Sequence, residues 1–189
     1  MEERSIYNMV TSIVSAAIMV AMLVLGIIFS SSALTTIFIC IYDGILIAHF
    51  ILQSIYHGKE EEKEVFYRLS RATLILATTL IMIHFVLLLT PSWKWILMGV
   101  LIGVGVLEIV IESLQKGIEM NYLLSGSRIL LWFWVIYTLY TFNFNVLLGT
   151  LAALILYFSQ LFGNAFQNKM VLSFDMISVI LFGLFIIFM

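Results

Sequence analysis

The chain has 189 residues, of which 63% are hydrophobic and 11% are charged. A typical water-soluble domain is about 45–50% apolar and about 25% charged, and a soluble protein of this size buries only about 70% of the surface that its unfolded chain exposes. The composition therefore excludes a water-soluble domain and a disordered chain, and predicts an integral membrane protein. The net charge of −2 excludes a nucleic-acid-binding protein, because it offers no basic field to a polyanion.

Six apolar stretches are long enough to cross the hydrocarbon core of a bilayer, which takes about 20 residues. In chain order they cover residues 9–29, 33–54, 69–89, 95–114, 146–163 and 171–189. A seventh, shorter run over 129–142 is dense in aromatic side chains, as is typical of a helix anchored at the membrane interface. A single helix from 129 to 163 would be about 50 Å long and would exceed the bilayer. We therefore predict one all-α domain over residues 1–189, a bundle of seven transmembrane helices in the plasma membrane.

The first apolar stretch is either a cleaved signal peptide or a retained helix. Its apolar run of about 20 residues is longer than the 7–15 residues of a signal peptide. The preceding segment, Met1–Asn8, carries two acids beside Arg4, whereas a signal peptide starts with a basic segment. Both features favour a retained first helix.

The basic residues predict how the seven helices are oriented. With the N-terminus in the cytoplasm, all of the Lys and Arg residues except Lys94 lie on the cytoplasmic side. These residues are Arg4, Lys59, Lys63, Arg68, Arg71, Lys116, Arg128 and Lys169. Cytoplasmic loops are enriched in Lys and Arg, and a count of six helices would scatter these charges over both faces. We predict a cytoplasmic N-terminus and an external C-terminus.

The longest predicted loop, over residues 57–68, is rich in charge. Its four glutamates are interleaved with Lys59 and Lys63, which is typical of helix-compatible charge pairs that face water. A vestibule that recruits cations is the alternative interpretation.

Ionisable side chains inside the predicted helices each cost about 2.5–3.5 kcal/mol to insert, so each needs a partner or a function. They are Asp43, His49, His84, Glu108, Glu112 and Asp175. At a rise of 1.5 Å per residue, Asp43 lies near the middle of the membrane. Glu108 and Asp175 lie in the inner half, whereas His84 lies alone in the outer half.

Polar side chains repeat four residues apart on three predicted helices, so the members of each pair share a helix face. The pairs are His49 with Gln53, Glu108 with Glu112, and Gln160 with Asn164. Gln53 and Glu112 lie close enough to the interface to be in contact with water. All three pairs lie in the inner half of the membrane. They predict a polar cavity that opens to the cytoplasm and is closed outward by apolar side chains.

Two interpretations of these polar groups remain open. In the functional one, Asp43, Glu108 and Asp175 bind a proton, a cation or a polar ligand. His49 is then a titratable neighbour, and His49 and Gln160 line the site. In the structural one, the carboxylic acids are neutral and form hydrogen bonds that hold the helices together.

The sequence contains no catalytic or cofactor-binding signature such as HExxH, a Walker loop or a dinucleotide fingerprint. The serines of Leu124–Ser127 lie at a predicted helix start, where serine normally caps the helix. His57 has no evident orienting acid, and Cys40 is the single cysteine. We therefore expect no enzyme activity, no metal and no cofactor. The GxxxG pattern from Gly99 to Gly103 is a close-packing device that favours association of copies in the bilayer.

Four local stretches carry a resemblance to a known family. They are Ala48–Ile51, Glu112–Lys116, Gly149–Lys169 and Val171–Ser173. These stretches resemble the heliorhodopsins, an inverted branch of the microbial rhodopsins with seven helices and a cytoplasmic N-terminus. The resemblance implies the same architecture.

The chain departs from that family at the chromophore. Rhodopsins hold retinal as a Schiff base on a lysine in the seventh helix, and the predicted helix over 171–189 contains no lysine. The loop between the first two helices is reduced to Ser30–Ser32, and Tyr67–Arg71 offers bases where the family has an acid. Covalent retinal is therefore excluded, and only the architecture is carried over.

Three functional classes follow from the sequence. The first is a transport or channel protein that moves a proton, a cation or a small polar solute, with Asp43 as the central ligand. The second is a retinal-free, rhodopsin-like sensor or membrane scaffold that couples to a cytoplasmic or membrane protein through the 57–68 loop. The third, an intramembrane enzyme acting on lipid, has the least support because no nucleophile–base pair stands out.

Overall fold

The computed structural model describes most of the first 140 residues and scattered positions beyond them. The described residues are 3–30, 32–58, 63–87, 89, 92–114, 121–140, 147, 148, 151, 154, 155, 177, 179–181 and 184. Within them every regular element is an α-helix, which confirms the all-α class. The helices are α1 (Glu3–Phe29), α2 (Ala33–Gly58), α3 (Lys63–Leu87), α4 (Lys94–Leu114) and α5 (Asn121–Tyr140).

Four of these helices are long and apolar enough to cross a membrane, namely α1, α2, α3 and α4. They coincide with the first four spans predicted from hydropathy. The apolar part of α5, Ile129–Thr138, is shorter, in agreement with the short run predicted there. The spans predicted at 146–163 and 171–189 lie mostly outside the described residues, so the count of seven helices stays a prediction.

Two helix boundaries differ from the predicted ones. α2 continues to Gly58 and α3 already begins at Lys63, so most of the loop predicted over 57–68 is helical. α5 begins at Asn121 rather than at 129, so Leu124–Ser127 lies inside the helix and not at its start. Hydropathy marks only the apolar part of a helix, whereas the helix itself can continue beyond the hydrocarbon core.

The connection between α1 and α2 is set by serine and threonine side chains. The Ser32 hydroxyl accepts a hydrogen bond from the backbone N–H of Thr35 at 3.1 Å, which is the geometry of an N-cap. The hydroxyls of Ser30 and Thr36 are 2.6 Å apart and join the two sides of the turn. This short turn makes α1 and α2 antiparallel neighbours.

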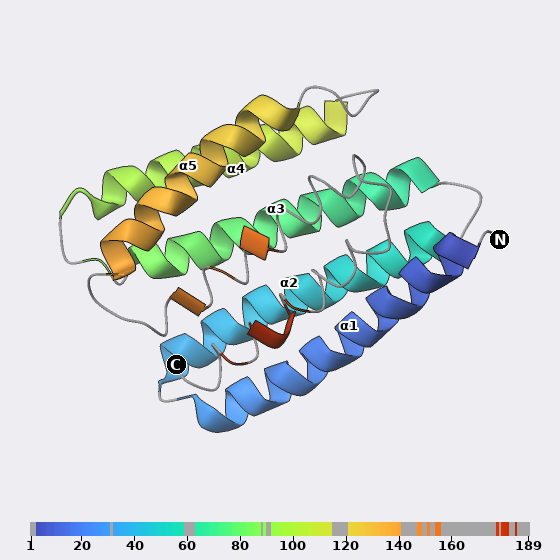
Figure 1. Ribbon diagram of the computed structural model, residues 1–189. Helices are drawn as coiled ribbons and strands as arrows, with labels where there is room; N and C mark the ends of the chain where they lie inside the picture. Colours follow the sequence, from blue (N-terminus) through green and yellow to red (C-terminus); the bar gives the residue numbers. More distant parts are fainter. Residues whose placement is uncertain are drawn as a thin grey trace.

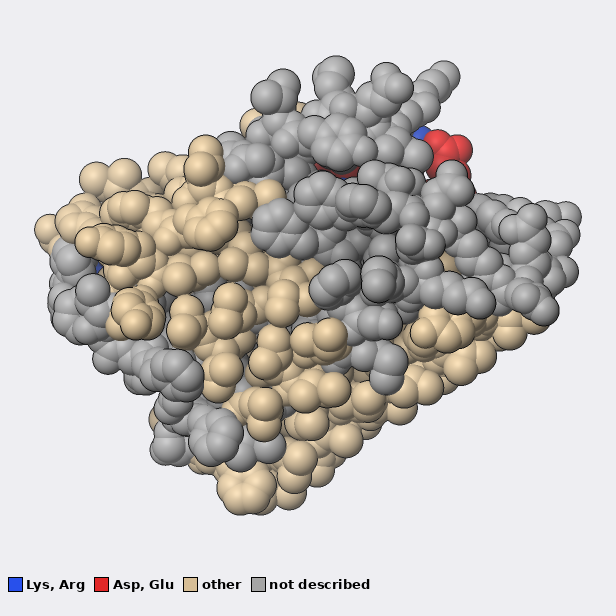
Figure 2. All heavy atoms as spheres, viewed as in Figure 1, with Lys and Arg blue, Asp and Glu red and all other residues tan. Residues whose placement is uncertain are grey.

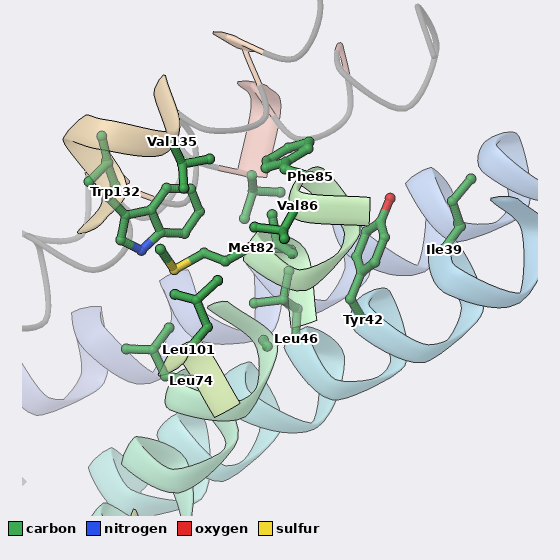
Figure 3. Close-up of a cluster of buried hydrophobic side chains, with 14 of the residues drawn as sticks. Ile39, Tyr42, Leu46, Leu74, Met82, Phe85, Val86, Leu101, Trp132 and Val135 are labelled. Atoms are coloured by element: carbon green, nitrogen blue, oxygen red, sulfur yellow. The ribbon is translucent and has the colours of Figure 1, made fainter. Parts of the chain in front are cut away.

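The helices follow one another across the bundle in chain order (Figure 1). α2 packs against α1, α3 against α2, and α4 against α3, each antiparallel to the one before, while α5 packs against both α4 and α3. α3 therefore occupies the centre of the described bundle. Its buried side chains meet those of α2, α4 and α5 in one apolar cluster (Figure 3), which includes Tyr42, Leu46, Leu74, Met82, Phe85, Val86, Leu101, Trp132 and Val135.

The outer surfaces of α1 and α4 are apolar. Large hydrophobic side chains that are exposed include Ile13, Val20 and Ile28 on α1, and Ile96 and Val106 on α4. The described part of the face seen in Figure 2 shows few charged atoms, and these lie near its edges. Such a surface suits contact with lipid chains, where a soluble protein would place charged groups.

Gly105 tests the close packing of α3 and α4. A Cβ atom built on Gly105 would lie 2.7 Å from Thr79 Oγ1 and 3.2 Å from Thr79 Cγ2, whereas one built on Gly103 would meet nothing within 4 Å. We expect Gly105→Ala to be less stable than Gly103→Ala by about 1–3 kcal/mol, the usual effect of overpacking. The free energy of unfolding in detergent micelles measures this difference.

The glycine pair controls for helix propensity, because both residues lie on α4 and both substitutions add one methyl group. Truncation of Thr79 to alanine in the Gly105→Ala background removes the clashing hydroxyl, so the double variant should regain most of the lost stability. Equal stability of the two single variants would contradict the tight α3–α4 contact.

Candidate functional site

Buried polar side chains gather at one end of the bundle. Because successive helices are antiparallel, the start of α1, the end of α2, the start of α3 and the end of α4 all lie at this end, which we call the N-terminal end (Figure 1). The buried polar residues there form what we call the polar layer: Thr11, Ser12, Ser15, His49, Gln53, Ser70, Arg71 and Glu112. Asp43, Thr78, Thr79 and Glu108 are buried nearer the middle, and His84 is buried near the opposite end.

His49 is anchored to α3 through one ring nitrogen. Its Nδ1 atom lies 2.7 Å from the backbone carbonyl oxygen of Ser70 and 3.1 Å from the Ser70 hydroxyl. A carbonyl oxygen can only accept, so Nδ1 carries the hydrogen and Nε2 holds the lone pair of the neutral ring. Nε2 is buried and has no hydrogen-bond partner among the described residues. The anchored imidazole thus presents an accepting nitrogen within the polar layer.

Arg71 and Glu112 form a buried ion pair between α3 and α4. Arg71 Nε lies 3.6 Å from Glu112 Oε1, and both side chains are buried. The distance is too long for a hydrogen bond through Nε, so this contact is mainly an attraction of opposite charges. Burial makes such an attraction stronger than in water, and makes the loss of either partner expensive.

A second arginine ties the same two helices together at the surface. Arg68 donates a hydrogen bond to the backbone carbonyl of Ser113 at 3.0 Å, near the C-terminal end of α4. It also pairs with the exposed carboxylate of Glu64, one turn away on α3. A cation at a helix C-terminus satisfies a free carbonyl and complements the helix dipole. The Glu64–Arg68 pair is of the helix-compatible kind predicted for this segment.

Asp43 is buried without a partner in the described part of the chain. The residue is 0% exposed, and neither carboxylate oxygen has a hydrogen-bond partner there. The hydroxyl of the adjacent Tyr42 is also buried and unpartnered among those residues. Burial of a polar group without a hydrogen bond costs several kcal/mol. Asp43 therefore destabilises the folded protein relative to an apolar residue at the same position.

Helix register places Asp43 and Glu108 at the same depth. From the His49–Ser70 contact, six residues along each helix lead to Asp43 on α2 and Leu76 on α3. From the Arg71–Glu112 contact, four residues along each helix lead to Glu108 on α4 and to Ile75, next to Leu76. The two acids thus lie level on the two helices that flank α3. A cavity shared by both stays a prediction, and Gln160, Asn164 and Asp175 lie outside the described residues.

The burial of Arg71, Gln53 and Glu112 is not predicted from the sequence. The charge pattern predicts Arg71 among the cations of the cytoplasmic side, whereas the side chain is buried within α3. Gln53 and Glu112, expected in contact with water, are only 9% and 7% exposed. An acid buried on one helix needs a base at the same depth, and this requirement is the signal that could have assigned Arg71 to Glu112.

The end opposite the N-terminal end is dominated by aromatic side chains. His84 contacts the ring of Phe38 edge-on, with the ring centroids 4.8 Å apart. Trp93 contacts Trp134 at 4.8 Å, and the Lys94 ammonium lies 5.5 Å from the Trp95 ring. Tryptophan next to a lysine is typical of a membrane–water interface. The apolar bundle is thus polar inside at one end and aromatic at the other.

Comparison of the chain with protein-family models, with curated proteins and with solved structures finds no match. The resemblance to the heliorhodopsins therefore stays a prediction. The polar layer and Asp43 are the features of the structure from which a function can be inferred.

Replacement of Glu112 by glutamine tests the buried ion pair. The variant leaves the Arg71 guanidinium buried without its counter-charge, so we expect the free energy of unfolding to fall by about 3–5 kcal/mol. Glu64→Gln removes an exposed charge of the same type and should cost no more than about 1 kcal/mol. Unfolding in detergent measures both variants.

The double variant Arg71→Met with Glu112→Leu removes both charges of the ion pair together. It replaces both charges by apolar groups of similar volume and should recover most of the stability that Glu112→Gln loses. A Glu112→Gln protein as stable as Glu64→Gln would show that the ion pair contributes nothing.

Proposed function

We propose that the protein moves a proton, a small cation or a small polar solute across a membrane, with Asp43 as the central binding group. The observation that carries this proposal is the complete burial of a carboxylate whose two oxygens have no partner among the described residues. Ionisable residues at membrane depth are costly and commonly mark ion or proton pathways. A residue that served only as structural glue would be expected to hydrogen-bond a neighbouring helix.

The remaining groups of the proposed site come from the polar layer, from α4 and from the sequence pattern. His49 and Gln53 lie between Asp43 and the N-terminal end on α2, and Glu108 lies level with Asp43 on α4. Gln160 and Asp175 are added from the sequence pattern alone. Together these groups would line a path from one side of the membrane to its middle.

The proposed topology is a multi-pass protein of the plasma membrane with seven helices, a cytoplasmic N-terminus and an external C-terminus. The four apolar helices α1–α4 support a membrane location, and the concentration of Lys and Arg on one side supports the orientation. In this orientation the polar layer faces the cytoplasm.

Flux into proteoliposomes tests the proposal. Purified protein is reconstituted, and uptake of protons, of radioactive sodium and rubidium, and of a panel of small polar solutes is measured. We expect at least one of these fluxes, and we expect Asp43→Asn to lower it at least about tenfold, because the variant keeps the shape but removes the charge and the exchangeable proton.

The matched control is Glu64→Gln, which neutralises an exposed acid on α3 and should keep the wild-type rate. Both variants are compared only after they elute and unfold as the wild type does. Full flux in Asp43→Asn would contradict the proposed site. If the wild type shows no flux at all, the sensor or scaffold that binds a protein partner through the 57–68 segment becomes the better hypothesis.

A further inference from the structure

We propose that the transported species is the proton, and that His49 relays it between Asp43 and the N-terminal end of the bundle. This inference rests on the proposed function and deepens it. It starts from three side chains that α2 buries at successive depths, namely Asp43, His49 and Gln53.

Four residues of α2 bury polar atoms that lack a hydrogen-bond partner in the described part of the chain. One is Tyr42, through its hydroxyl, and the other three are Asp43, through both carboxylate oxygens, His49, through Nε2, and Gln53, through Oε1. His49 lies six residues from Asp43, which is about 120° around the helix, and Gln53 lies one turn further toward the N-terminal end. Single unpaired polar atoms are uncommon in protein interiors. Asp43, His49 and Gln53 thus follow one another from the middle of the bundle to its polar end, and each can accept a hydrogen bond; we call these three residues the line.

The chemistry of this line favours a proton over a metal cation. Hard cations such as sodium, magnesium and calcium take several oxygen ligands at once, and imidazole is a ligand of transition metals rather than of hard cations. A proton needs only one lone pair at a time. A carboxylate followed by an imidazole nitrogen and an amide oxygen supplies single lone pairs in sequence.

The Ser70 contact makes His49 suited to pass a proton on. The neutral ring donates from Nδ1 to the Ser70 carbonyl and leaves Nε2 free to accept. When Nε2 takes up a proton, the imidazolium still donates from Nδ1, so the anchor to α3 persists in both states. When Nε2 gives the proton to an Asp43 oxygen, one N–H bond breaks and one O–H bond forms, and the neutral ring is restored.

The spacing requires water between the two groups. Six residues of helix correspond to a rise of about 9 Å, whereas direct proton transfer requires atoms within hydrogen-bond reach or one bridging water. The polar layer supplies hydroxyl groups that can hold water at the N-terminal end, from Ser12 and Ser15 on α1 and Ser70 on α3. A short chain of water molecules would connect Gln53, His49 and Asp43.

The charged groups around the line are of both signs. Arg71, next to Ser70 on α3, opposes a positive charge on His49, and Glu112 on α4 compensates Arg71. Glu108 on α4 lies level with Asp43, and Tyr42 is its neighbour on α2. The buried polar groups of α1 are the hydroxyls of Thr11, Ser12 and Ser15. His49 can thus take up a proton without adding to an unbalanced cluster of positive charge.

Proton flux into proteoliposomes with an internal pH dye, driven by a potassium–valinomycin potential, tests the inference. We expect His49→Gln and Asp43→Asn each to lower the flux at least about tenfold, in line with the loss of an acid–base group. The matched control is His84→Gln, a buried histidine near the opposite end that contacts Phe38. Its flux should stay within about twofold of the wild type.

Two further measurements separate a relay from a structural role. Imidazole added to His49→Ala should restore proton flux, because it supplies the missing base, whereas a merely structural defect would not respond. Infrared difference spectra during flux should show the C=O band of a protonated carboxyl group that is absent in Asp43→Asn and retained in Glu64→Gln.

The outcomes distinguish this inference from the proposed function. Sodium, rubidium or solute flux that depends on Asp43, without proton flux, overturns the proton assignment and leaves the proposed function standing. Proton flux that survives in His49→Gln overturns the relay. Absence of every flux that depends on Asp43 overturns both proposals.

Discussion

The fold depends on one constraint, which is that polar groups buried in an apolar bundle must find partners on the neighbouring helix. α3 supplies these partners because it lies between α2 and α4 (Figure 1). Ser70 accepts the hydrogen bond from His49 of α2, and the next residue, Arg71, balances Glu112 of α4. Two adjacent residues of one helix thus fix its register against two others. In a membrane, an apolar side chain is as stable against lipid as against another helix, so apolar contacts do not select the helix partner. Polar contacts such as these specify which helix faces which.

Asp43 departs from this constraint, and the contrast with Glu112 shows why that matters. Both are buried acids, but Glu112 has a guanidinium beside it, whereas the Asp43 oxygens have no partner in the described residues. A chain that can place Arg71 opposite Glu112 could equally place a polar residue opposite Asp43. Near the level of Asp43, the buried side chains of α3 are instead Leu74, Ile75, Ala77 and Thr78, and the Thr78 hydroxyl donates to carbonyls of its own helix. The Arg71–Glu112 pair obeys the rule that a buried charge has a partner and Asp43 does not, and a residue that breaks such a rule points to a site with a function.

The sequence predicts the helices well and their contacts poorly. Hydropathy located α1–α4 because each has an apolar run of sufficient length, but it misplaced the start of α5, where polar residues continue the helix beyond the apolar run. The depth of Asp43 follows from its distance to the ends of α2. The burial of Arg71 could not be predicted by counting charges, since that method assigns each basic residue to a loop. Its pairing with Glu112 depends on the α3–α4 register, which the close approach of Gly105 to Thr79 also reflects.

The asymmetry of the bundle determines where a moving proton would meet its barrier. Between Asp43 and the N-terminal end of the bundle, α2 carries His49 and Gln53. Between Asp43 and the opposite end, its buried residues are Tyr42 and Ile39. Further toward that end, Phe38 contacts His84 edge-on, and Phe85 and Trp132 are fully buried in the apolar cluster (Figure 3). The polar side chains that would line the proposed path therefore lie on one side of Asp43 only. Because close-packed aromatic side chains exclude water, the proposed transport would meet its barrier on the other side, between Asp43 and the aromatic end of the bundle.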